Sequence, residues 1–428
     1  MELAELFSDL VSSTSFSDIP EPSIHEAKRR IIDSLAVAYS SQNSPPAKAL
    51  RDALPSFSGL GLLLGGGTSA PDVAAFYNTL LIRYLDFNDT YLSLEPLHPS
   101  DMIGGLLAID PHLNGKELIR AIVLGYEIST RLCDSTSLRK KGFDHVNFLQ
   151  VGATAALGAA LGLNKEQLIN AISISLIPHI ALRETRSGSL SMWKAGAAAE
   201  AVRNSVFAAL LAKSGFTGPS TPFSGKMGFK NVVAPDMSDT PFKSMGREKI
   251  LQTYIKKYPV EYHAQAAVEI GLRLKEMIRG DIIKVTVETY EAGKTILADE
   301  GKWDPRNKET ADHSLPFIVA VSLITGRFWL DAYNLIGNPK VMEVMRKVEV
   351  VENQEYTKIY PTELPTRITV KTSAGTFSDE IRVPRGHYKN PMSDKELEEK
   401  ALRLGLSKEL IGRIWDLENH EVKDIVAW

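Results

Sequence analysis

The chain has 428 residues, of which 44% are hydrophobic and 24% are charged, and its formal net charge is −3. This composition is typical of a globular protein with a large core, and it lacks the positive excess that favours nucleic-acid binding. The one cysteine, Cys133, excludes an internal disulfide and a metal site made from several cysteines of one chain. No apolar run reaches the roughly 20 residues of a membrane span, and the N-terminus lacks a signal-peptide pattern. We therefore expect a cytoplasmic protein in a reducing compartment.

The first part of the chain has helical patterns. Residues 2–15 and 22–41 predict helices, because their apolar side chains recur at helical spacing. Residues 73–85 and 102–109 predict two buried helices, and most of the chain between 102 and 215 is helical and rich in alanine. Residues 216–260 are rich in glycine, proline and serine, which predicts an irregular connection.

The pattern changes after residue 265. Residues 281–290 alternate as a strand, and residues 367–384 predict a hairpin with its turn at 373–375. Residues 313–326 between them predict a helix, and Ser393 with Glu396 has the spacing of a capping box. We expect a mainly α protein with a large all-helical domain (1–265, completed by 389–428) and a smaller α+β lid domain (266–388).

The loop at 84–101 (YLDFNDTYLSLEPLHPSD) lies between two predicted helices and carries many polar groups. Loops of this kind, held by rigid elements on both sides, often carry reactive residues. For Asp89 and Asp101, a turn and a helix cap are the simpler interpretations. Asp86 and His98 can be either structural or functional on this pattern alone. Pro99 biases His98 away from the helical conformation.

Other candidate residues lie at predicted helix starts or among small side chains. These are His145, His263, His313, Arg183, Arg186, Lys194, Lys256 and Lys257. Each alone is more often structural or solvated, but a lysine among alanines, as at Lys194, needs a partner, and a substrate with several carboxylates would supply one. The chain has no HExxH, GxSxG, Walker or dinucleotide-binding motif, so hydrolase, kinase and hydride-transfer functions lack support.

Several segments occur in a characteristic order: DFNDT, HPSDMIGGLLA, GFDHV, WKAGAAAEAVRNSVFAALLAKSGFTGP, YPVEYHAQAAVE, KWDP, ETADHSLPFIVAV and NPMSDKELEEK. Together they resemble the MmgE/PrpD family over most of the chain. The resemblance implies a helical domain with a smaller α+β lid, a homodimer, and a reaction that uses no metal or other cofactor. GFDHV and YPVEYHAQAAVE are most similar to the members that dehydrate 2-methylcitrate.

The family's site positions match six residues of this chain: Asp86, Thr90, His98, His145, Lys256 and His263. There are also departures from the family pattern. Ser191 stands where the family often has a lysine, and Lys194, three residues on, lies on the same helix face and could replace it. Phe317 stands where decarboxylating members have a tyrosine.

The resemblance implies dehydration of 2-methylcitrate to 2-methylaconitate, a step of the methylcitrate cycle in propionate catabolism. Such a reaction removes a proton α to a carboxylate and expels a β-hydroxyl, so it needs acid–base groups and cations beside carboxylates. We expect His98, His145 and His263 to share the acid and base roles. The remaining expected roles are orientation by Asp86, catalysis and carboxylate binding by Lys256, and substrate binding by Thr90, Lys194, Lys257, Ser191 and Phe317.

Other functions remain open at this stage. The alternatives are cis-aconitate decarboxylation, dehydration of another polycarboxylate, or a non-enzymatic role in binding a polycarboxylate. An iron–sulfur cluster is not expected, because Cys133 alone could not hold one.

Overall fold

The computed structural model of the chain describes residues 1–188 and 190–428, and the chain forms two compact units. Unit 1 comprises Met1–Ser187, Met192–Thr253 and Ser393–Trp428, and unit 2 comprises Gly188–Ser191 and Tyr254–Met392. The sequence pattern places the start of the second domain at residue 266, whereas unit 2 already includes the chain from Tyr254 onward. The reason is that the intervening segment bonds within unit 2: the Ile255 N–H donates to the Gly386 carbonyl at 3.1 Å.

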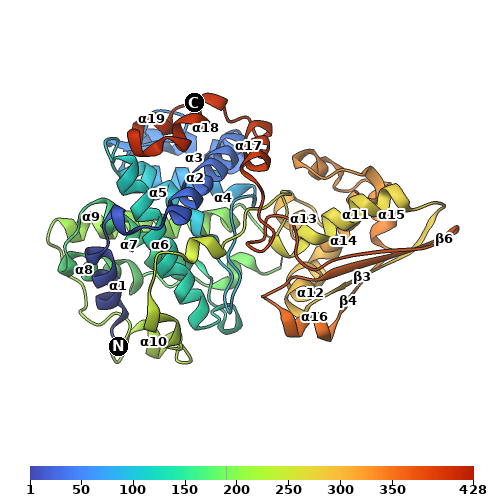
Figure 1. Cartoon of the computed structure of the whole chain (residues 1–428), viewed down its shortest axis with the longest axis horizontal. Helices are drawn as coiled ribbons and strands as arrows, with labels where there is room; N and C mark the ends of the chain where they lie inside the picture. The colour runs from blue at the N-terminus through green and yellow to red at the C-terminus, as the bar shows by residue number, and fades with distance from the viewer. Residues whose placement is uncertain (189) are drawn as a thin grey trace. The chain divides into compact units, whose positions relative to one another are not determined.

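Unit 1 is helical (Figure 1). Its helices are α1 (Leu3–Ser13), α2 (Glu21–Ser41), α3 (Pro45–Ala53), α4 (Pro71–Tyr84), α5 (Ile103–Ile109), α6 (Gly115–Ser135), α7 (Val146–Ala160), α8 (Lys165–Leu176), α9 (Trp193–Lys213), α10 (Phe229–Val232), α17 (Asp394–Arg403), α18 (Lys408–Trp415) and α19 (Lys423–Val426). The short strands β1 (Gly61–Leu62) and β2 (Thr68–Ser69) pair antiparallel.

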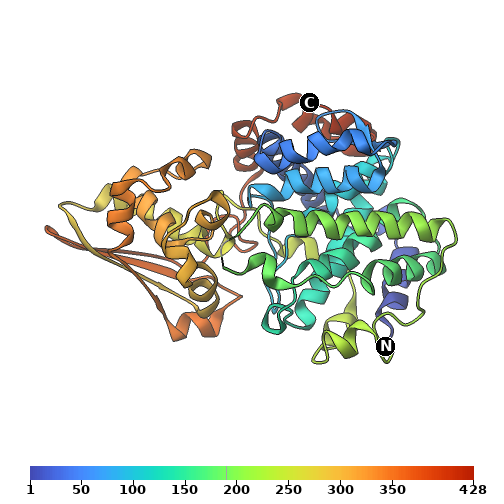
Figure 2. The ribbon, with the colours of Figure 1, turned by 180° about the vertical axis from the view of Figure 1, so that it is seen from behind.

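Small residues let the central helices of unit 1 pack closely. The helix α6 packs along α7, and α4 packs against both α5 and α9; Figure 2 shows α9 in green beside α4 in light blue. A Cβ atom on Gly152 of α7 would lie 2.6 Å from the Ser129 Cβ of α6, a distance that no larger residue tolerates. Among the described residues, no helix has both the length and the apolar character needed to cross a membrane.

Unit 2 combines a sheet with helices. The strands are β3 (Ile282–Thr289), β4 (Val348–Glu352), β5 (Thr366–Thr372) and β6 (Gly375–Ile381). The helices are α11 (Gln265–Met277), α12 (Glu291–Leu297), α13 (Lys308–Ala311), α14 (Leu315–Thr325), α15 (Pro339–Met345) and α16 (Gln354–Ile359). The strand order is β4-β3-β5-β6, in which β3 pairs parallel with β4 and antiparallel with β5.

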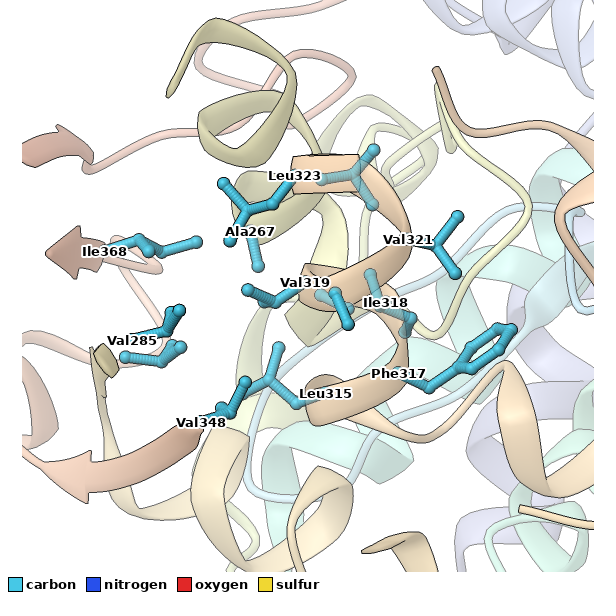
Figure 3. Close-up of a cluster of buried hydrophobic side chains, with 14 of the residues drawn as sticks. Ala267, Val285, Leu315, Phe317, Ile318, Val319, Val321, Leu323, Val348 and Ile368 are labelled. Atoms are coloured by element: carbon cyan, nitrogen blue, oxygen red, sulfur yellow. The ribbon is translucent and has the colours of Figure 1, made fainter. Parts of the chain in front are cut away.

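The core of unit 2 lies between the sheet and the helices α11 and α14. Figure 3 shows Leu315 and Val319 of α14 directed toward Val285 of β3 and Val348 of β4. The burial pattern alternates along β5, as expected for a strand with one covered face.

The predicted fold class is confirmed, because the protein is mainly helical and has a smaller α+β unit. The hairpin of β5 and β6 turns at Ser373 and Ala374 as predicted. The capping box is also present: the Ser393 and Glu396 side chains each accept the other's backbone N–H at the start of α17.

Candidate active site

The loop after α4 holds Asp86 in an unusual backbone conformation. Asp86 has a φ of 51°, in the left-handed region that asparagine, aspartate and glycine tolerate best. Its buried carboxylate meets two buried cations: Arg83 Nη1 lies 2.6 Å from Oδ1, and Lys194 Nζ lies 3.2 Å from Oδ2. Arg83 comes from the last turn of α4 and Lys194 from the first turn of α9. Asp101 Oδ2 also lies 3.8 Å from Arg83 Nε, so the two cations face Asp86 directly and a second carboxyl group at a longer distance.

His98 faces this group from the other end of the loop. Its Nδ1 lies 2.7 Å from the Asp89 carbonyl oxygen and 3.3 Å from the Thr90 hydroxyl. A carbonyl oxygen only accepts hydrogen bonds, so the geometry assigns the proton of the neutral ring to Nδ1. The lone pair is then on Nε2, which lies 3.9 Å from Asp86 Oδ1. His98 can accept a proton at Nε2, and the Asp86 carboxylate would stabilise the resulting charge.

His145 precedes α7, and its ring centroid lies 5.7 Å from that of His98. Its Nδ1 lies 3.1 Å from Asp144 Oδ1, whereas its buried Nε2 has no hydrogen-bond partner among the described residues. Burial, followed by the charge of Arg186, holds the pKa of His145 well below its ordinary value, although Asp144 acts in the opposite direction. His145 is therefore neutral at pH 7 and presents an unoccupied acceptor atom.

The residue that orients His145 is itself held by an arginine. Arg186 Nε lies 3.0 Å from each of the Asp144 oxygens. Burial opposes ionisation of Asp144, but Arg186 and His145 outweigh it and lower the pKa of this carboxyl group. An ionised Asp144 favours the His145 tautomer that carries its proton on Nδ1.

A second group of predicted residues lies in unit 2 around Glu261 and His263. The Glu261 carboxylate accepts both the His263 backbone N–H, at 2.7 Å, and the ring Nδ1–H, at 2.8 Å. The His263 Nε2 lies 3.3 Å from the Tyr360 hydroxyl. Burial raises the pKa of Glu261, but His263, His313 and Lys256 outweigh this effect and bring it down to about 2. Lys256 is fully buried near this carboxylate.

Three predicted substrate-binding residues lie outside these groups. Phe317 is 1% exposed and belongs to the core of unit 2, where its ring stacks with Tyr333 and points away from the sheet (Figure 3). Lys257 is partly buried, with Nζ 5.5 Å from the ring centroid of Tyr258. Ser191 is exposed. Their roles in substrate binding stay predictions.

The prediction that Asp101 caps a helix was wrong. His98 occupies the N-cap of the short 3-10 helix Pro99–Met102, and Asp101 lies inside this helix with a fully buried side chain. Its carboxylate accepts from the Asn88 amide at 2.8 Å, and burial raises the pKa of Asp101 to about 7. Asp89 makes no local turn either, because it accepts from the distant Ser100 N–H and the Tyr126 hydroxyl. Both aspartates therefore fix the two ends of the loop to each other.

Several residues of the two groups were not identified from the sequence. Arg83 had a local signal, since it precedes Asp86 by three residues at the end of a helix. Glu261 likewise lies two residues before His263. Tyr360 had no local sequence signal, because it is 97 residues from His263 in the chain.

Comparison with known proteins matches the N-terminal and the C-terminal part of the chain to two domains of the same family. The MmgE/PrpD N-terminal domain matches residues 5–240, and the MmgE/PrpD C-terminal domain matches residues 258–408. A 2-methylcitrate dehydratase of Escherichia coli K12 is 31% identical over 74% of this chain and 71% of its own length. A 2-methylcitrate dehydratase of Cupriavidus necator is 30% identical over 79% of this chain and 75% of its own length. A fungal alkylcitrate dehydratase is 28% identical over 83% of this chain and 78% of its own length. The chain belongs to the MmgE/PrpD family.

Proposed function

We propose that the protein is a hydro-lyase that dehydrates 2-methylcitrate to 2-methylaconitate. The observation that carries this proposal is the buried group of unit 1. It combines two cations on Asp86 with two histidines, His98 and His145, whose Nε2 atoms bear lone pairs. The named activity of the relatives supports the choice of substrate.

In the proposed reaction, a base removes a proton from the carbon next to a carboxylate. The electron pair of that C–H bond forms the C=C bond, and the β-hydroxyl leaves as water after receiving a proton from an acid. His98 suits the base role, because its Nε2 is the acceptor atom and Asp86 lies beside it. The cations of Arg83 and Lys194 would attract a substrate carboxylate and stabilise the charge that develops on it.

His145 has a different proposed role. Because its pKa lies well below the ordinary value, it is a weak base and stays neutral near pH 7. A neutral ring with a free Nε2 lone pair can accept a hydrogen bond from a substrate hydroxyl and so orient it. Lys256 and His263 keep their predicted roles in carboxylate binding and proton transfer, supported by the ionised Glu261 that holds the His263 Nδ1 proton.

Purified protein incubated separately with 2-methylcitrate, citrate and cis-aconitate tests the proposal. We expect water loss from 2-methylcitrate, followed through the ultraviolet absorbance of the conjugated alkene. The variant His98→Gln should lower kcat by about 10²-fold or more, which is the usual contribution of an acid–base residue. His112→Gln is the matched control, because His112 is an exposed histidine of unit 1 that pairs with Glu421.

Each contrary outcome identifies another function. Release of carbon dioxide from cis-aconitate, without alkene formation from 2-methylcitrate, would assign the chain to decarboxylation. Saturable binding of 2-methylcitrate without any turnover would indicate a binding role. Unchanged turnover in His98→Gln would show that His98 is not the base.

A second candidate substrate is a citrate with a longer 2-alkyl chain. The fungal alkylcitrate dehydratase, which is similar over 83% of this chain, favours this alternative. Comparison of kcat/KM for 2-methylcitrate and a longer 2-alkylcitrate decides between them, and a higher value for the longer substrate would favour the second.

The proposal also includes the setting of the enzyme. We propose a cytoplasmic homodimer that acts in the methylcitrate cycle of propionate catabolism. Light scattering coupled to size-exclusion chromatography tests the dimer, and a monomer mass at working concentrations would contradict it.

A further inference from the structure

A buried lysine from the C-terminal part of unit 1 contacts the residue that follows Asp86. Lys400 of α17 donates from Nζ to the Phe87 carbonyl oxygen at 2.9 Å and pairs with Asp33 Oδ1 of α2 at 2.6 Å. The same Nζ lies 3.8 Å from the centroid of the Phe87 ring, close enough for a cation–π interaction. The side chains of Lys400, Asp33 and Phe87 are all buried. One ammonium group therefore holds both the main chain and the side chain of the residue after Asp86.

This contact lies where the loop needs external support. A left-handed aspartate is less stable than its ordinary conformations, and such geometry persists only where surrounding contacts fix it. After Phe87 the loop is held by hydrogen bonds between its own residues, since Asn88 donates to Asp101 and Asp89 accepts from Ser100. At Phe87 itself, the carbonyl oxygen accepts a hydrogen bond from Lys400, which is 313 residues away in the chain.

The position of Asp86 matters for the chemistry proposed above. Its carboxylate must stay between Arg83 and Lys194 and within 3.9 Å of His98 Nε2. Asp86 is bonded directly to Phe87, so a displacement of the Phe87 main chain would move the Asp86 main chain and its carboxylate with it.

We propose that Lys400 is a positioning residue, which fixes the carbonyl group and the ring of Phe87 and thereby keeps the carboxylate of the adjoining Asp86 directed toward His98. As a statement about catalysis, this inference rests on the proposed function; as a statement about loop geometry, it does not. It extends the functional part of the chain to α17, and it gives α17 a role beyond covering α2.

Lys28 provides a matched control for this inference. It also joins α2 to the C-terminal segment, because its Nζ pairs with Glu418 at 2.6 Å and donates to the Trp415 carbonyl at 2.9 Å. Lys28 and Lys400 thus each bind one carboxylate and one carbonyl, and each carboxylate pair joins α2 to the C-terminal segment. Of these two lysines, Lys400 contacts the loop residue Phe87, whereas Lys28 contacts Glu418 and Trp415.

The test compares Lys400→Met, Lys400→Arg, the double variant Lys400→Met/Asp33→Asn, and Lys28→Met. The double variant removes both charges, so we expect it to fold even where the single change leaves Asp33 buried with an unpaired charge. We expect the double variant to lower kcat about tenfold or more while KM changes less than about threefold, because misplacement acts on the reacting geometry. Lys400→Arg keeps the charge and should recover part of kcat. Lys28→Met should lower the melting temperature and leave kcat unchanged.

Hydrogen–deuterium exchange provides a measurement that does not depend on turnover. We expect faster exchange in peptides from residues 84–101 in the double variant, and no such change in Lys28→Met. Wild-type-like kcat and loop exchange in a folded double variant would overturn the inference. If the wild type fails to turn over 2-methylcitrate, the proposed function fails, and the exchange of the loop alone decides whether Lys400 positions it.

Discussion

Glu95 is a residue of the loop at 84–101 to which the proposed reaction assigns no role. Its side chain is fully buried and accepts from the Arg139 N–H at 2.9 Å and the Ser137 hydroxyl at 3.2 Å, but its Oε1 has no hydrogen-bond partner among the described residues. Burial raises the pKa of Glu95 from 4.5 to about 7, against the opposing effects of these hydrogen bonds and of Arg183. Burial of the ionised form thus costs stability, and the neutral form is favoured in the folded state.

This shift predicts a pH-dependent effect of Glu95→Gln. The folded pKa is raised, so the folded state binds more protons than the unfolded state between pH 4.5 and 7. The associated stability is present below pH 4.5 and is lost as the pH rises to about 7. Glutamine does not ionise, so the unfolding free energy of Glu95→Gln should not show this loss. Relative to the wild type, it should therefore rise by on the order of 2 kcal/mol as the pH increases from 5 to 8. Chemical denaturation at both pH values measures this difference, and a difference independent of pH would contradict the assignment.

At the scale of elements, the end of the loop is fixed by close packing of α5 on α4. A Cβ atom on Gly104 of α5 would lie 2.5 Å from the Thr79 backbone nitrogen and 2.8 Å from its Cα. Such contacts cannot be relieved by moving a side chain, because they involve the main chain of α4. The 3-10 helix Pro99–Met102 leads directly into α5, so this contact also sets the position of His98.

We therefore expect Gly104→Ala to destabilise unit 1 by about 1–3 kcal/mol or more, in the range of overpacked cores. Gly412→Ala is the control, because a Cβ at this position of α18 meets nothing within 4 Å. That change should stabilise the protein by up to about 1 kcal/mol, through the better helix propensity of alanine. Urea denaturation followed by circular dichroism compares the two variants, and equal effects would show that the α4–α5 contact can relax.

At the scale of the whole molecule, the chain has two compact units, each with its own buried side chains. In unit 2 these come from one face of the sheet and from α11 and α14. In unit 1 they come from helices, for example Leu149 of α7. Units with separate cores can unfold in separate steps, so a single unfolding transition is not required of this chain.

We predict that core truncations affect the two units selectively. Ile368→Ala in β5 removes a fully buried side chain of unit 2, and Leu149→Ala does the same in unit 1. Each should cost about 2–5 kcal/mol in its own unit. Differential scanning calorimetry should show one component shifted by Ile368→Ala and the other by Leu149→Ala. A uniform shift of the whole profile by both variants would indicate that the units unfold together.

The sequence by itself determined the properties that depend on local patterns. Helical and strand periodicities located the long helices of unit 1 and the β5–β6 hairpin, and the Ser393–Glu396 spacing located the start of α17. They did not locate α3 or the short α10, which lies in the stretch expected to be irregular. The polar loop between α4 and α5 was also visible, because composition and flanking helices define it within about 20 residues.

The tertiary structure alone decided which groups meet and in which protonation state. The pairing of Asp86 with Lys194, of Asp144 with Arg186 and of Phe87 with Lys400 joins residues from 42 to 313 positions apart. Such contacts leave no periodic signal, since they depend on how closely the helices pack. The structure also changed the interpretation of Asp101 from a helix cap to a buried carboxyl group with a raised pKa, because the cost of desolvation appears only when the chain is folded.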